Sequence, residues 1–154
     1  MEEKETFTLP EDLTSLHKEL DLIQDCISRM ARNSFMLKGW SVTVMVITWA
    51  IIGTESCGYL SLLLLLIPTI MFWGLDAFFL LTEKRYRMLY NWVLSERLEK
   101  KNYAYLYDLN PLRFKEEAGS GCGCFFSKTL LPFYGALVLV VLGAVIVCHL
   151  CIYW

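Results

Sequence analysis

An acidic residue at the end of a long apolar run is the first candidate for chemistry in this chain. Asp76 follows Ser56–Leu75, twenty residues without a formal charge. A helix of twenty residues spans about 30 Å, the thickness of the hydrocarbon core of a bilayer. A charged group near that core costs about 3 kcal/mol unless it is paired, and such groups are often functional. We therefore expect Asp76 to have a basic partner or a function of its own.

Basic residues of the preceding segment are the expected partners when the chain folds back on itself. Lys38 or Arg32 is predicted to pair with Asp76, because they lie at similar distances from the turn between the first two apolar runs. Glu83 shares a helix face with Asp76 and is predicted to pair with Arg29 or Arg32. Together these residues form the predicted charged collar: Asp76, Glu83, Arg29, Arg32 and Lys38. Two interpretations stay open, since the pairs could only fix the hairpin, or Asp76 could belong to a polar constriction in an oligomer.

The cysteines allow several kinds of chemistry without selecting one. Cys122 and Cys124 form a C-x-C pair with no second pair and no nearby histidine, so a zinc site is not expected. Their position beside an apolar run leaves acylation open. A disulfide from Cys57 to Cys148 or Cys151 is also open, because all three lie at the predicted outer side of the membrane.

Motifs of known enzyme classes are missing from the sequence. It contains no phosphate-binding glycine loop, nucleophile elbow or H-E-x-x-H run. We therefore expect a non-enzymatic protein without cofactor or metal.

Three uncharged runs indicate an all-α integral membrane protein with three transmembrane helices. Hydrophobic residues make up 56% of the chain, and the mean hydropathy is +0.45. The runs are Gly39–Thr54, Ser56–Leu75 and Thr129–Trp154, of which the last two reach spanning length unaided. The expected order is a flexible N-terminus (1–10), a long cytoplasmic amphipathic helix (11–38), the first span (39–54), the second span (59–82), a cytoplasmic basic helical segment and linker (83–128) and the third span (129–152).

Positive charges are distributed unevenly and predict the orientation. Of the 14 Lys and Arg residues, five lie in residues 1–38 and nine in residues 83–128. By the positive-inside rule, the N-terminus and the middle segment face the cytoplasm, while the short hairpin turn and the C-terminus lie outside.

Apolar residues at alternating three- and four-residue steps predict an amphipathic first helix. We call this set the heptad seam: Leu13, Leu16, Leu20, Ile23, Ile27, Met30 and Leu37, with Ser34 in its one polar position. The seam could pack on a neighbouring helix of the same subunit or could join subunits. No proline interrupts residues 11–53, so the helix is expected to continue into the first span.

Later segments carry further expectations. Pro68 is predicted to kink the second span, and Ala118–Cys124 to be a short flexible connector. Four basic residues of the helix after Thr82 are expected to face outward: Arg85, Arg87, Arg97 and Lys100. A basic helix beside a membrane fits anionic lipid better than nucleic acid, so no nucleic-acid partner is expected.

Three sequence blocks resemble a large, mostly uncharacterised group of small bacterial multi-pass membrane proteins. Residues 27–40 (ISRMARNSFMLKGW) are similar to that group's R-M-A-x-N-S-F-x-x-K-x-W run. Residues 72–80 (FWGLDAFFL), followed by Glu83, Arg85, Arg87 and Tyr90, resemble its second block, and residues 127–135 (SKTLLPFYG) its third. The layout is similar to that of small transmembrane effectors of antiphage systems.

This resemblance implies a bacterial inner-membrane protein that forms homo-oligomers. The function it implies is that of a pore-forming or membrane-perturbing effector in defence. A structural or adaptor subunit that docks a cytoplasmic protein without conduction is the alternative, because a shared architecture does not fix function.

Overall fold

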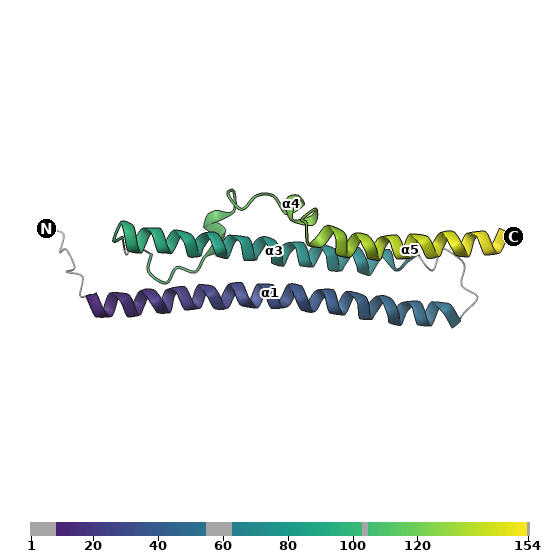
Figure 1. The fold of residues 1–154 in the computed structure, drawn as a ribbon, viewed down its shortest axis with the longest axis horizontal. Coiled ribbons are helices and arrows are strands. Elements are labelled where there is room, and N and C mark those ends of the chain that lie inside the picture. Colours follow the sequence, from purple (N-terminus) through teal and green to yellow (C-terminus); the bar gives the residue numbers. More distant parts are fainter. Residues whose placement is uncertain (1–8, 55–62, 103–104, 154) are drawn as a thin grey trace.

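The computed structural model describes residues 9–54, 63–102 and 105–153, and this part of the chain is helical without strands. Two long helices form an antiparallel hairpin, α1 (Leu9–Thr54) and α3 (Leu66–Leu94), and α3 continues into a π-helical turn, η1 (Ser95–Glu99). A short 3-10 helix, η2 (Pro111–Phe114), and a short helix, α4 (Gly121–Phe125), then lead to α5 (Leu130–Tyr153). Figure 1 shows α5 lying beside one half of the hairpin and pointing away from the other half. The fold is therefore elongated, with three helices side by side over part of its length.

The hairpin has two halves of different character. We call residues 35–54, 63–82 and 130–153 the apolar half, and residues 9–34, 83–102 and 105–118 the polar half. In the apolar half, large side chains such as Trp40, Ile70 and Leu139 are exposed on all three helices. α1, α3 and α5 are each long and apolar enough to cross a membrane. This finding suggests a membrane protein.

α1 is one uninterrupted helix of 46 residues, about 69 Å long at 1.5 Å per residue. The amphipathic segment and the first predicted span are thus a single element, as the absence of proline predicts. The expected capping box at the start of this helix falls on Thr8 and lies outside the described residues.

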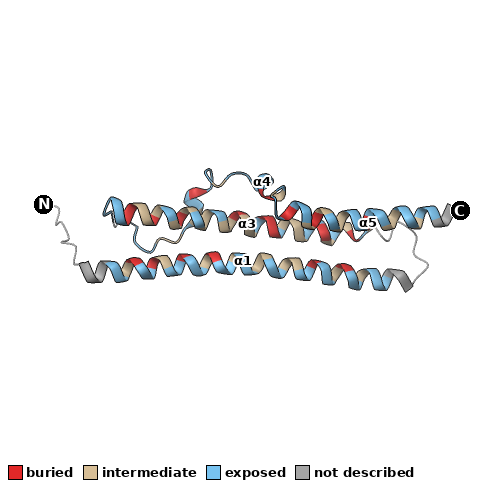
Figure 2. Cartoon of the chain, in the orientation of Figure 1, coloured by how far each residue is buried: buried red, intermediate tan, exposed pale blue. Residues whose placement is uncertain are grey.

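The heptad seam packs inside the chain. Leu16, Ile23 and Ile27 are buried in a cluster with Leu89, Val93 and Phe114, and Leu20 packs against it. Figure 2 shows the buried residues of α1 on the side that faces α3. In the structure the seam therefore packs on another helix of the same chain, which is the first of the two interpretations. Leu13, at the far end, is exposed, and Met30 and Leu37 are half-buried.

Two further clusters join the three helices of the apolar half. Met45 of α1, Leu65 before α3 and Val141 of α5 form the first. The second joins residues of α3, α4 and α5: Ala77, Leu81, Cys124, Leu130 and Tyr134. α5 is thus attached to the hairpin by one side, from Leu130 as far as Cys148.

One expectation about local structure is confirmed and another is wrong. Residue 63 is helical, residues 64–65 form a turn, and α3 begins at Leu66, so the helix is interrupted one turn before Pro68, where the sequence predicted a kink. The expected flexible connector is partly helical, because the Ser120 side chain accepts a hydrogen bond from the Gly123 N–H and caps α4.

Candidate functional site

A buried ion pair connects α1 and α3 inside the apolar half. Lys38 Nζ lies 2.5 Å from Asp76 Oδ2, and the Asp76 side chain is fully buried. The Ser34 hydroxyl donates a hydrogen bond to Asp76 Oδ1, and Lys38 Nζ lies 2.9 Å from Ser34 Oγ. The pairing of Lys38 with Asp76 agrees with the sequence-based prediction. Ser34, the polar position in the heptad seam, is the second donor to this carboxylate.

α5 adds a tyrosine to this polar group. The fully buried Tyr134 hydroxyl lies beside Asp76 and Ser41, without a hydrogen bond of normal geometry to either. Ser41 itself donates to the Lys38 carbonyl at 2.8 Å. We call Ser34, Lys38, Ser41, Asp76 and Tyr134 the inner polar cluster, to which all three long helices contribute. Sequence reasoning did not predict Tyr134 as a member of this cluster. A polar hydroxyl near the start of the third apolar run was the feature that could have indicated it.

The other members of the predicted collar lie elsewhere. Glu83 pairs with Arg87 one helical turn away, at 2.7 Å, instead of with Arg29 or Arg32 on α1. Arg29 Nη2 lies 3.6 Å from Cys26 Sγ on its own helix, and both Arg29 and Arg32 are exposed. An i,i+4 partner is always within reach on a helix, whereas a partner across the hairpin requires the correct register. The collar is therefore reduced to the Lys38–Asp76 pair.

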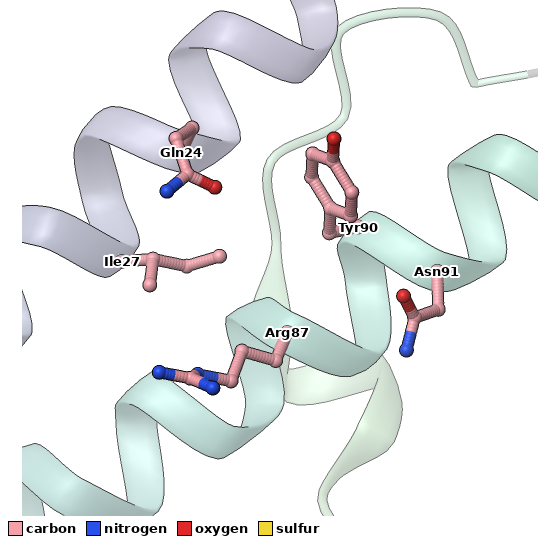
Figure 3. A pocket seen from close by; sticks show the side chains of 5 residues that line it. All are labelled: Gln24, Ile27, Arg87, Tyr90 and Asn91. Carbon is pink, nitrogen blue, oxygen red and sulfur yellow. The ribbon is translucent and has the colours of Figure 1, made fainter.

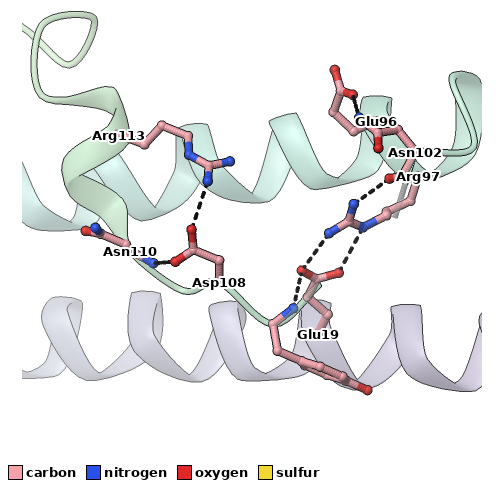
Figure 4. Close-up of polar contacts among 8 residues, drawn as sticks. Glu19, Glu96, Arg97, Asn102, Asp108, Asn110 and Arg113 are labelled. Carbon is pink, nitrogen blue, oxygen red and sulfur yellow. Dashed lines mark hydrogen bonds and ion pairs between the residues drawn. The ribbon is translucent and has the colours of Figure 1, made fainter. Parts of the chain in front are cut away.

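A second buried ion pair, which sequence reasoning missed, holds the far end of the polar half. Arg97 Nε and Nη2 each lie 3.2 Å from a Glu19 carboxylate oxygen, and both side chains are almost fully buried. Arg97 also donates to the Asn102 carbonyl, and the Tyr107 N–H donates to Glu19 at 3.0 Å (Figure 4). The expectation that Arg97 faces outward is wrong, because the π-helical turn and the loop after it enclose its guanidinium. The position of Glu19 in the sequence could have indicated this pair, because Glu19 lies between Leu16 and Ile23 on the seam side of α1.

Residues around this pair fix the loop that follows η1. Arg113 Nη2 pairs with Asp108 at 2.8 Å, and its guanidinium stacks on the rings of Trp92 and Tyr105, at 4.7 and 4.8 Å. Tyr105 and Tyr107 have φ angles of 64° and 60°, which non-glycine residues rarely adopt. Such strain persists only where neighbouring contacts enforce it. The loop therefore presents Tyr105, 68% exposed, in a fixed place.

Hydrogen bonds shift the pKa values of an ion pair at the same end, in which Lys100 is exposed and Glu96 is buried. Those from Lys100 and then Asn102 lower the pKa of Glu96, and Glu96 raises the pKa of Lys100. This pair stabilises η1 above the normal carboxyl pKa, and the stabilisation is lost as the pH falls through the lowered pKa of Glu96.

A pocket of about 310 Å³ lies between α1 and α3 in the polar half. Figure 3 shows Gln24 and Ile27 of α1 opposite Arg87, Tyr90 and Asn91 of α3. Two amides, a phenol and a guanidinium can hydrogen-bond a small polar group, but they include no nucleophile–base pair. These side chains suit hydrogen bonding to a small polar group.

The cysteines differ in exposure. Cys122 is exposed and Cys124 buried, with Lys84 Nζ 3.6 Å from the Cys124 sulfur. Cys148 is a free thiol, and Cys57, its proposed partner, lies outside the described residues. Within the described ranges, no group of three His, Cys, Asp or Glu side chains could hold a metal ion.

Comparison of the chain with protein-family models, curated proteins and solved structures gave no match.

Proposed function

We propose that this chain is a non-enzymatic inner-membrane protein that self-associates and perturbs the bilayer. In this proposal the apolar half crosses the membrane, and the polar half and the N-terminus lie in the cytoplasm, where most Lys and Arg residues are found. The effector role in bacterial antiphage defence comes from the sequence resemblance alone. The geometry supports the self-association step.

The open face of α5 is the observation that carries this proposal. α5 packs on the hairpin through Leu130, Tyr134 and Val141, while Ala136 and Gly143 are exposed on another face. A Cβ atom added at Gly143 would meet no atom within 4 Å. Small residues seven positions apart leave a shallow groove on one helix face, and in lipid such grooves favour close packing of a second helix. We therefore place the subunit contact on this face of α5.

The inner polar cluster has a structural role in this proposal. Asp76 is enclosed by α1 and α5, so its carboxylate does not face the surface of one subunit. A conducting path would have to form between subunits, away from Asp76. Of the two interpretations of the collar, this geometry favours pairs that fix the hairpin.

Bulky substitutions on the open face test the proposal. Purified protein in liposomes should release a trapped dye, and its mass in mild detergent should be a multiple of the chain mass. Gly143→Ile should reduce both assembly and dye release, whereas Leu131→Ile, at an exposed position off this face, should change neither. A wild-type protein that stays strictly monomeric and seals the liposomes would refute the proposal.

Docking of a cytoplasmic protein is the second candidate, and one observation favours it. The far end of the polar half exposes Leu98, Tyr105 and Leu112, which would lie well outside the lipid. Tyr105→Ser with Leu112→Ser should abolish activity in cells but leave dye release unchanged if a partner docks there. Equal loss of both readouts would count against docking.

A further inference from the structure

Arg85 is a half-buried guanidinium in an unusual position. Leu81 and Leu89, one turn before and after it on α3, are both buried, so helix periodicity places Arg85 near the packed side of α3. Leu81 belongs to the cluster with Cys124 and Tyr134, and Leu89 to the separate cluster of the polar half. The arginine therefore occupies the junction between two apolar clusters.

The Arg85 Nε atom is buried and has no hydrogen-bond partner among the described residues. A buried donor without an acceptor costs about 1–3 kcal/mol, and more when the group is charged. Glu83, the acid two residues away, is already paired with Arg87. The geometry thus leaves a permanent positive charge that can accommodate an anion.

The depth of Arg85 indicates which anion is available, on the assumption that the apolar half is inserted in the membrane. Phe35 and Phe78 are exposed and mark the inner end of the apolar surface. Arg85 lies four residues beyond Leu81, about 6 Å along the helix, and the headgroup layer is about 5–7 Å thick on each side. Lys84 contacts Cys124 of α4, and Lys128 lies two residues before α5, so further positive charges lie near the same level.

We propose that Arg85 binds the phosphate group of an anionic phospholipid, with Lys84 and Lys128 adding positive charge around the headgroup. A guanidinium donates two parallel hydrogen bonds to phosphate oxygens, which a lysine cannot reproduce. The bound headgroup would cover the junction between the two apolar clusters and hold α3, α4 and the start of α5 together. This site extends the proposed function, since it ties the fold to the lipid composition of one leaflet.

Thermal unfolding of the full chain in nanodiscs tests the site. Nanodiscs of phosphatidylcholine are compared with nanodiscs that also contain phosphatidylglycerol, and the matched pair of variants is Arg85→Gln and Arg87→Gln. Phosphatidylglycerol should raise the Tm of wild type and of R87Q, and R85Q should lose most of this rise. In phosphatidylcholine alone, R85Q should unfold at the wild-type temperature or above, because it removes a charge without a partner. Arg85→Lys should recover part of the rise.

Three results would overturn the proposal. R85Q could keep the full rise with phosphatidylglycerol. R85Q could be strongly destabilised or unfolded in phosphatidylcholine, which would reveal a partner within the protein. Inorganic phosphate could raise the Tm in detergent while phosphatidylglycerol has no effect, which would assign the site to a soluble phosphate. Gly143→Ile, which tests self-association, should leave the lipid response intact, so the two proposals can fail separately.

Discussion

Two donors from one turn of α1 stabilise the carboxylate of Asp76 inside the apolar half. Ser34 and Lys38 are four residues apart, so both reach the same carboxylate across the hairpin. A buried pair of this kind is weak evidence for net stability, but removal of one partner leaves an uncompensated charge. Substitutions can separate the net stability that the pair contributes from the cost of leaving one charge buried without its partner.

Lys38→Met should destabilise the fold by about 3–5 kcal/mol, because Asp76 would remain buried without its cation. The double variant Lys38→Met with Asp76→Leu should recover most of that loss, since an apolar pair of similar size is often as stable as the ion pair. Thermal or denaturant unfolding in detergent measures both.

Arg87→Gln is the control for this pair. It breaks an exposed ion pair worth about 0–1 kcal/mol. If Lys38→Met costs no more than Arg87→Gln, the Lys38–Asp76 pair does not hold the hairpin.

The sequence limited the predicted partner of Asp76 to Lys38 or Arg32, and the structure has Lys38. An acid at the end of an apolar run has few basic partners at equal depth. Glu83 lies where solvent and local partners are available, so depth alone could not choose between Arg87 and the arginines of α1. Glu19 and Arg97 were missed because their burial depends on a loop, held by contacts of Tyr107 and Asn102, that has no sequence periodicity.

Trp73 is the residue through which α4 is attached to α3 and α5. Its indole N–H donates to the Phe125 carbonyl at 3.0 Å, and its ring lies 5.4 Å from Phe125 and 5.8 Å from Tyr134. The sequence predicted a flexible connector here because glycines dominate it. Tertiary contacts of Phe125 and the Ser120 cap override that propensity, which a composition-based argument cannot include.

Trp73→Ala should release α4 and expose Cys124. Cys124 is 1% exposed in the structure and Cys122 is open to solvent. A maleimide should therefore label only Cys122 of this C-x-C pair in wild type, and both cysteines in Trp73→Ala. Trp73→Phe keeps an aromatic ring without the hydrogen bond and should give intermediate labelling of Cys124. Peptide mass spectrometry measures each site, and an unlabelled Cys124 in a folded Trp73→Ala protein would contradict this account of α4.

Two buried ion pairs set the register of the whole hairpin. Lys38 and Glu19 are 19 residues apart on α1, and their partners, Asp76 on α3 and Arg97 on η1, are 21 residues apart. Because ion pairs tolerate little displacement, a shift of one turn would break both of them and bury four unpaired charges. The apolar seam alone would tolerate such a shift, since its residues repeat every three or four positions. The sequence therefore predicted the hairpin and the seam. The seam pattern alone could not determine which helix packs on it, or how the two helices are aligned along their axes.

Cysteine cross-linking tests whether the register is made within one chain. Ile27 and Leu89 lie in the same buried cluster, so Ile27→Cys with Leu89→Cys, in a chain whose six native cysteines are replaced, should form a disulfide under mild oxidation. Closure within one chain should be independent of protein concentration and should leave the mass of the monomer on a denaturing gel. Ile27→Cys with Leu139→Cys is the control, because Leu139 is exposed on α5 and should give no such closure. Cross-linked dimers that increase with concentration would show that the seam joins subunits, and the contact assigned to the open face of α5 would then lose its structural basis.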